Sequence, residues 1–228
     1  MCGRTSLFAP QSVLASRFDA EPVEPLEPRY NIAPREDLAV IRKDAPETID
    51  LLEWGLLPSW VENPADAPRP INARAETVAT KRSFAEAFEQ RRCLVLADGF
   101  YEWQETRGGK QPYRVERTDG KPFAMAGLFE RWEGDDEVQE TVTVVTTEPN
   151  AVVEPLHHRM AVVLDADEEE RWLADADPGA HQELFDPSPA DQWRSYPVST
   201  RVNDPDNDDP SIVEEIDPDT QTGLDEFA

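Results

Sequence analysis

Short runs of apolar residues, broken at close intervals by turn-forming residues, are the main pattern along this chain. Runs rich in β-branched and aromatic residues that end at Gly, Pro, Asn or Asp are typical of strands. The run at 141–147 is almost entirely β-branched, and the run at 93–97 has the continuous apolar character of a buried strand. The predicted strands and extended segments cover residues 30–34, 38–42, 50–57, 93–97, 113–117, 123–132, 141–147, 161–164 and 195–199.

Helical periodicity is confined to a few short stretches. Phe84 and Phe88 are four positions apart and would share one face of a helix. Acidic residues fill the first turn of the stretch that begins at Asp167, and the helix dipole favours negative charge at that end. Predicted helices cover residues 12–18, 81–92, 167–174 and 178–185, the last preceded by Asp177 as its cap. Proline-rich loops are predicted at 21–28 and 63–70.

Many short strands and few helices indicate one fold class. We expect an α+β fold, mostly antiparallel β, as a single compact barrel-like domain with a few flanking helices. A turn at 107–110 predicts a hairpin ahead of strand 113–117. The domain is expected to span residues 1–216, with Ile212, Val213 and Ile216 docked on it. Residues 217–228 are predicted to form an acidic, disordered tail.

The charge of the chain is extreme. It has 48 acidic and 22 basic residues, a net charge of −26, and only four lysines. The acidic residues are spread along the chain, which is typical of a halophile-type surface whose self-repulsion is screened by molar salt. Taken alone, this charge argues against nucleic acid as a partner. In molar salt, however, phosphate attraction contributes little to any DNA binder, so particular arginines matter more than the net charge.

Composition also predicts what the chain lacks. There is no apolar run of membrane-spanning length and no signal pattern at the N-terminus, so we expect a soluble, cytoplasmic protein with no membrane partner. Two cysteines, Cys2 and Cys93, and three histidines do not form a metal-binding motif. We therefore expect no metal and no cofactor, and we assign Cys93 to the core.

Cys2 becomes the N-terminal residue if Met1 is removed. Its amine and thiol would then lie on adjacent carbons, with reference pKa values near 8 and 8.5. The amine can condense with an aldehyde to an imine, and the thiol can close on the imine carbon to give a thiazolidine. The alternative is a frayed terminus where a small residue merely permits methionine removal. The residues that lie near Cys2 in the fold must decide between these two interpretations.

Five further residues carry possible chemistry, each with a structural alternative. Glu102 lies among aromatic residues, where desolvation would raise its pKa and make it a general acid, unless strand alternation turns it outward. His157 is a candidate general base or a surface histidine, and Trp60 is a stacking platform for a nucleobase or the edge of a core. Asn72 and Arg74 would share one face of a strand, lining a site or satisfying a loop.

Six motifs, in order, resemble one family. They are Met-Cys-Gly-Arg at 1–4 and the segments 30–34, 54–58, 71–77, 93–103 and 156–160. This order is similar to that of the SRAP family, the SOS-response-associated peptidase domains, also called abasic-site processing proteins. Val198-Ser199 with Val202-Asn203 fits the family's late motif. The chain departs from the family at Ala161, where proline is usual, and in its charge.

The resemblance implies a role for each residue. Cys2 would be the nucleophile that crosslinks to an abasic site in single-stranded DNA, acting with three further catalytic residues, Asn72, Glu102 and His157. Phosphate contacts would come from Arg4, Arg74, Arg82 and Arg159, and Trp60 would lie in a DNA-facing loop. The family implies possible autoproteolytic and lyase activity, no cofactor and no metal. We expect a monomer.

Two other functions stay open. A thiol peptidase would use Cys2 to attack a peptide carbonyl, with His157 as the base. A non-covalent reader of single-stranded or modified DNA would not need Cys2 at all. Cleavage of an added peptide would identify the first, and DNA retention after blocking of the N-terminal amine would identify the second.

Overall fold

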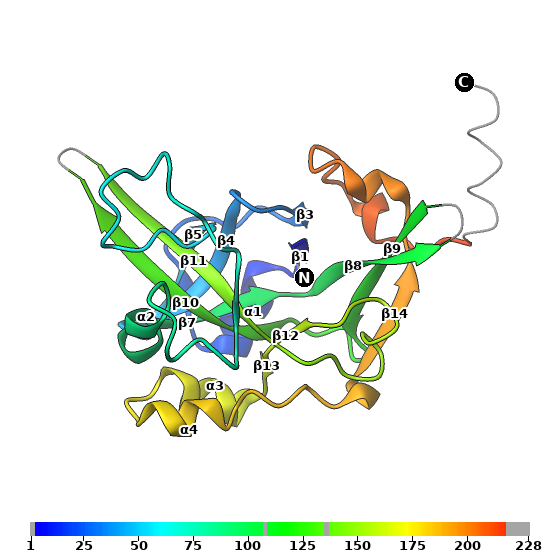
Figure 1. Ribbon diagram of the computed structural model, residues 1–228. Helices are drawn as coiled ribbons and strands as arrows, with labels where there is room; N and C mark the ends of the chain where they lie inside the picture. Colours follow the sequence, from blue (N-terminus) through cyan, green and yellow to red (C-terminus); the bar gives the residue numbers. More distant parts are fainter. Residues whose placement is uncertain (1–2, 107–108, 135–136, 218–228) are drawn as a thin grey trace.

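The computed structural model describes residues 3–106, 109–134 and 137–217 (Figure 1). The strands are β1 Thr5–Leu7, β2 Glu21–Pro22, β3 Arg29–Ile32, β4 Asp37–Arg42, β5 Ala45–Trp54, β6 Asn72–Arg74, β7 Arg92–Ala97, β8 Gly99–Thr106, β9 Gly109–Arg117, β10 Phe123–Glu133, β11 Val138–Thr147, β12 Met160–Ala161, β13 Val163–Leu164 and β14 Trp193–Pro197. The helices are α1 Gln11–Phe18, α2 Ala85–Gln90, α3 Ala166–Leu173 and α4 Pro178–Gln182, with short 3₁₀ turns η1 Ala190–Gln192, η2 Thr200–Asn203 and η3 Pro210–Val213.

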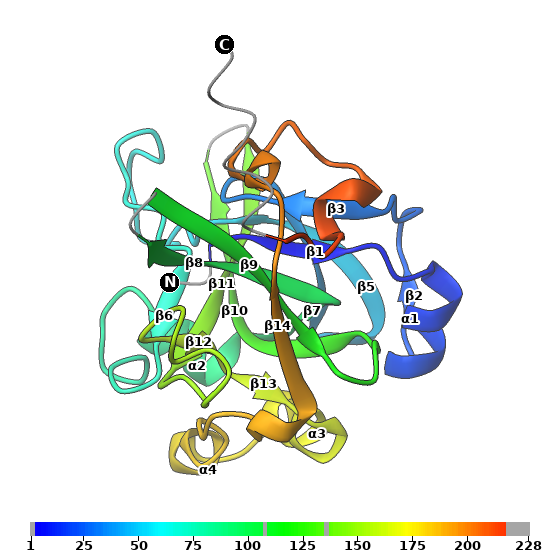
Figure 2. The ribbon, with the colours of Figure 1, turned by 90° about the vertical axis from the view of Figure 1, so that its right-hand side faces the viewer.

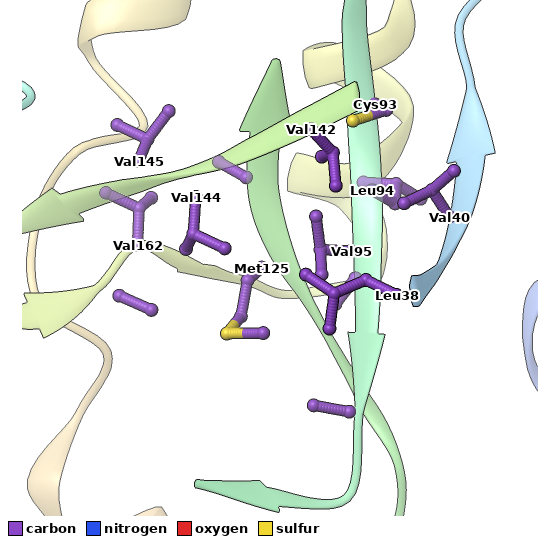
Figure 3. Close-up of a cluster of buried hydrophobic side chains, with 14 of the residues drawn as sticks. Leu38, Val40, Cys93, Leu94, Val95, Met125, Val142, Val144, Val145 and Val162 are labelled. Carbon is purple, nitrogen blue, oxygen red and sulfur yellow. The ribbon is translucent and has the colours of Figure 1, made fainter. Parts of the chain in front are cut away.

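Five strands close into a barrel. Antiparallel pairing runs in the order β11, β10, β7, β4, β5, and a parallel pairing of β5 with β11 completes the ring. Closure leaves these strands without free edges. Leu38, Val40, Val95, Met125 and Val142 come from four of the barrel strands, and their buried side chains point toward one another (Figure 3). The barrel is therefore held by a continuous apolar interior.

A second sheet of five strands contains β1, the first strand of the chain. Its order is β14, β9, β8, β1, β3, so β1 lies in its interior between β8 and β3. The connection from β7 to β8 passes through a single residue, Asp98, so this sheet continues directly from the barrel. In Figure 1 the second sheet lies beside the barrel, with β9 and β14 farthest from it.

Helices α3 and α4 lie together below the sheets (Figure 2). The indole nitrogen of Trp172 on α3 donates to the backbone oxygen of Cys93 on β7 at 2.9 Å. Buried Arg92 donates to the backbone oxygens of Trp172 and Ala174, both at 2.7 Å. Because these carbonyls end α3, one arginine satisfies the helix terminus and attaches it to the barrel.

The predicted α+β, mostly antiparallel fold is confirmed, with local corrections. The segment 21–28, predicted as loop, contains the two-residue strand β2, which pairs with β5. Predicted strand 161–164 is two short strands, because β12 pairs with β11 and β13 with β10. Asp177 does precede α4, but its side chain makes no capping hydrogen bond.

The end of the domain follows the prediction in part. Ile212 is fully buried, and Ile216 donates from its backbone to the oxygen of Pro197 at 3.0 Å. The predicted tail lies outside the described residues after Asp217, so the boundary at 216 stays a prediction. Across the described part of the chain, every helix is too short or too polar to cross a membrane.

Candidate active site

The pairing of β1 with β8 brings the start of the chain toward Glu102. Thr5 pairs with Phe100 and Ser6 with Gly99 in antiparallel register. The backbone nitrogen of Tyr101 also donates to the oxygen of Arg4 at 2.9 Å. Continued by one step, this register sets Gly3 opposite Glu102. Cys2 itself lies outside the described residues.

A buried polar cluster holds β1 in this register. The carboxylate of Asp98 accepts hydrogen bonds from the hydroxyl of Ser6 at 2.6 Å and from the backbone nitrogens of Phe8 at 2.6 Å and Ala9 at 3.0 Å. Arg114 donates to the same Ser6 hydroxyl at 2.7 Å and pairs with Asp98 at 3.2 Å. Both side chains are buried, so removing either would leave the other without one of its charged partners.

Glu102 has the environment of a general acid. Its side chain is only 2% exposed, although strand alternation alone allowed it to point outward. Burial raises the pKa of Glu102 to about 7, because desolvation disfavours the carboxylate. At neutral pH a large fraction of this group therefore carries a proton that it can transfer.

Glu102 and His157 line one pocket. Its volume is about 410 Å³, and Trp103, Lys110 and Asn203 complete its lining. Burial lowers the pKa of His157, so the ring is neutral at neutral pH. Nδ1 of His157 lies 3.0 Å from the backbone nitrogen of Arg159 and 3.1 Å from its backbone oxygen. The structure thus brings together two of the predicted catalytic residues.

Asn72 and Arg74 line a second pocket of about 570 Å³. They lie on β6, which pairs in parallel with β11, and Ala73 between them is fully buried. The prediction that the two side chains share one face is therefore confirmed. Thr77, Thr80, Lys81 and Phe84 form the rest of this pocket.

Arg159 joins the turn that carries His157 to the β6 segment. Its guanidinium pairs with the carboxylate of Glu76 through two nitrogens, at 2.5 and 3.0 Å, and also donates to the backbone oxygen of Thr146. Thr146 is the register partner of Arg74. Through Thr146 and Glu76, Arg159 therefore connects the turn of His157 to the segment that carries Arg74.

Trp60 and Arg82 form a stacked pair. The Arg82 guanidinium lies 4.1 Å from the centre of the Trp60 ring, and Trp60 is 46% exposed. The backbone nitrogen of Ser59 donates to the buried carboxylate of Glu130 at 2.8 Å, which fixes the loop before Trp60. The indole is thus presented at the surface, and the alternative of a buried core edge does not hold.

Arg4, like Arg159, is a predicted DNA contact whose side chain is largely buried. It is 9% exposed, and its guanidinium donates to the side-chain oxygen of Asn31 at 2.7 Å and to the backbone oxygen of Val202 at 2.5 Å. These bonds tie the residue before β1 to β3 and to the 3₁₀ turn η2. Its role as a phosphate contact remains a prediction.

Several residues of the site were not singled out from the sequence. Asn203 was seen only as part of a late motif, and Lys110 only as one of four lysines and as the end of the predicted turn at 107–110. Glu76 was seen only inside the 71–77 segment, and nothing in the spacing marks it as the partner of Arg159. Among the described residues, no group of His, Cys, Asp and Glu could hold a metal ion. Cys93 is fully buried, as predicted for a core residue.

The fold and the site define a β-barrel protein with an acid and a histidine in one pocket near the start of the chain. A family model described as SOS response associated peptidase (SRAP) matches residues 1–205, and the chain belongs to this family.

Relatives match over nearly the whole chain. Abasic site processing protein YoqW of Bacillus subtilis (strain 168) is 37% identical over 224 residues, which cover 94% of this chain and 99% of that protein. Abasic site processing protein YedK of Escherichia coli (strain K12) is 31% identical, with 87% and 88% covered. A crystal structure of a protein from Bacteroides thetaiotaomicron superimposes with a TM-score of 0.86 at 28% identity, covering 94% of this chain and all of that one.

Proposed function

We propose that this protein captures abasic sites in single-stranded DNA as a covalent adduct of its N-terminal Cys2, after removal of Met1. The observation that carries the proposal is the pocket that buried Glu102, with a pKa of about 7, shares with neutral His157, together with the strand register that sets Glu102 opposite Gly3. An acid and a base beside an aminothiol are what imine and thiazolidine formation needs.

The relatives support the same substrate. YoqW and YedK are both named abasic site processing proteins, and the family model begins at residue 1. An abasic deoxyribose is an aldehyde in its open form, the group with which an aminothiol condenses. The exposed Trp60–Arg82 pair offers a stacking surface for a neighbouring base, and exposed Arg74 offers a phosphate contact.

The reaction is written in three steps. The Cys2 amine adds to C1′ of the aldehyde to give a carbinolamine, and proton transfer from Glu102 lets the hydroxyl leave as water. The resulting imine carbon is attacked by the Cys2 sulfur, and His157 accepts the proton that the thiol gives up. The products are one thiazolidine and one water. Holding amine, thiol and aldehyde together makes ring closure effectively intramolecular.

Asn72 and Arg159 are assigned supporting roles. Asn72 would orient the aminothiol, and Arg159 would contact phosphate while its backbone holds His157. The imine also permits β-elimination at the sugar, so a weak strand-cleaving lyase activity is part of the proposal. The thiol limits this activity because ring closure removes the imine.

Substitution of Cys2 tests the proposal. Cys2→Ala keeps the N-terminal amine but cannot close the ring, so it should give an adduct only when borohydride reduces the imine. The wild type should give an adduct that survives denaturation without reductant. If Cys2→Ala also gave an adduct without reductant, Cys2 would not be the closing nucleophile. Cleavage of an added peptide that requires Cys2 and His157 would instead favour the thiol peptidase.

A further inference from the structure

Two residues that line the Glu102–His157 pocket have no part in the proposed proton transfers. Lys110 comes from β9 and Asn203 from η2, and although they are far apart in sequence, both line the same pocket. Both carry N–H donors. The pocket therefore has acid–base groups together with a separate set of donors.

The orientation of the Asn203 amide is fixed by Trp103. The indole nitrogen of Trp103 lies 2.7 Å from Oδ1 of Asn203. Because an indole nitrogen can only donate, Oδ1 is the acceptor and the amide NH₂ is on the opposite branch. The backbone oxygen of Asn203 also accepts from the Arg4 guanidinium at 3.4 Å, so the residue is held at both its side chain and its backbone.

Lys110 is weakly held by its neighbours. Its side chain is 66% exposed, and its Nζ lies 3.9 Å from the carboxylate of Glu105, at the outer limit of an ion pair. An exposed pair at this distance contributes little, so the ammonium can turn to another anion. The chain has only four lysines, yet Lys81 and Lys110 line the two pockets that contain the proposed catalytic residues.

We propose that Lys110 and Asn203 form a subsite for a phosphodiester group, one of the two phosphates that flank the abasic deoxyribose. The inference rests on the proposed function, because it places the sugar at Glu102 and His157. Phosphate oxygens accept charge-assisted hydrogen bonds from ammonium and amide donors. Anchoring the flanking phosphate would hold C1′ at the aminothiol.

The experiment combines protein variants with a change in the DNA. Single-stranded oligonucleotides with one abasic site carry either ordinary phosphates or a neutral methylphosphonate at one flanking position, tested in turn on each side. Lys110→Met is compared with Lys121→Met, a lysine of matched exposure, 69%, whose Nζ also lies 3.9 Å from a carboxylate, that of Asp119. The measured quantity is the second-order rate of adduct formation.

The proposal predicts non-additive losses. Methylphosphonate at one of the two positions should slow wild-type capture about threefold to fivefold, the size of one partly solvated charge pair. Lys110→Met should slow capture of ordinary DNA by a similar factor, with no further loss on methylphosphonate. Lys121→Met should behave as the wild type. In a plot of log rate against log salt concentration, the slope for Lys110→Met should differ from that of the wild type by about 0.7. This is the value for one phosphate contact on a single strand.

Asn203→Asp tests the second donor. The aspartate still accepts from Trp103 but replaces the donor by a negative charge, so capture should slow at least as much as in Lys110→Met. Equal rates for Lys110→Met and Lys121→Met, or fully additive losses, would overturn the subsite. Equal rates for Asn203→Asp and wild type would remove Asn203 from it. Absence of any adduct from the wild type on ordinary DNA would instead refute the proposed function.

Discussion

Nδ1 of His157 lies within hydrogen-bond distance of both backbone groups of Arg159, at 3.0 Å from the nitrogen and 3.1 Å from the oxygen. An unprotonated Nδ1 accepts from the N–H, and a protonated Nδ1 donates to the carbonyl. The ring can therefore gain and lose a proton without turning. The same Arg159 holds Glu76 with its guanidinium, so it connects the turn of His157 to the segment that follows β6.

Glu76→Gln tests how the ion pair between Arg159 and Glu76 affects the affinity for DNA. A phosphate that binds Arg159 must compete with the Glu76 carboxylate, whose pKa is lowered by its hydrogen bond to Arg159. Removing the charge should tighten non-covalent binding of single-stranded DNA about two- to fivefold, the range of a partly exposed ion pair. Fluorescence anisotropy measures it, with the exposed Glu47→Gln as a control for net charge. Weaker binding would show that Glu76 positions Arg159 instead of competing for it.

The pH dependence of capture follows from Glu102. As pH rises, the Cys2 amine, with a reference pKa near 8, loses its proton and becomes nucleophilic, so the rate increases. As pH passes about 7, Glu102 loses the proton that it must donate, so the rate decreases. The wild-type profile should therefore have a maximum between roughly pH 7 and 8.

In Glu102→Gln the falling limb should disappear and the rate should be lower at every pH up to the wild-type maximum, while DNA affinity stays close to that of the wild type. Initial rates of adduct formation across this pH range measure the profile. A variant that keeps the falling limb would assign it to another group. Equal losses of affinity and rate would place Glu102 in the binding surface.

Much of this arrangement was predictable from the sequence. Local periodicity identified most strands and the α3 helix, and motif order identified Glu102 and His157, which share a pocket. Closure of the barrel was not predictable, because the parallel pairing of β5 with β11 joins segments almost ninety positions apart, as Glu53 and Thr141 show. Long-range partners such as Arg159 and Glu76 leave no signal in local spacing.

Substitution of Gly99 tests the packing around Arg114 that holds β1 in register with β8. A Cβ at this position would lie 2.4 Å from the guanidinium of Arg114, which is buried and cannot move aside. Gly99→Ala should lower the free energy of unfolding by about 1–3 kcal/mol, the usual effect of overpacking. Gly179→Ala, with no atom within 4 Å of the added Cβ, is the control. Chemical denaturation followed by circular dichroism compares them, and equal stabilities would contradict the packing argument.

An ordinary DNA-binding protein loses affinity as the salt concentration rises, but we expect a different response from this protein. The net charge of −26 repels DNA in dilute salt, and molar salt shortens the Debye length to about 3 Å. Close arginine contacts, base stacking and the covalent bond remain. Adduct yield should rise or hold from low to molar KCl, with folding followed in parallel. A steady fall in yield from a folded protein would show that phosphate attraction governs capture.

The most direct test of the account is the intact mass of the protein after incubation with single-stranded DNA that carries one abasic site. The thiazolidine forms with loss of one water. The predicted mass is therefore that of the chain without Met1 plus the oligonucleotide minus one water, stable without reductant, and digestion should place the adduct on Cys2. A protein that binds this DNA while folded but shows only its unmodified mass, or an adduct on any other residue, would contradict the account.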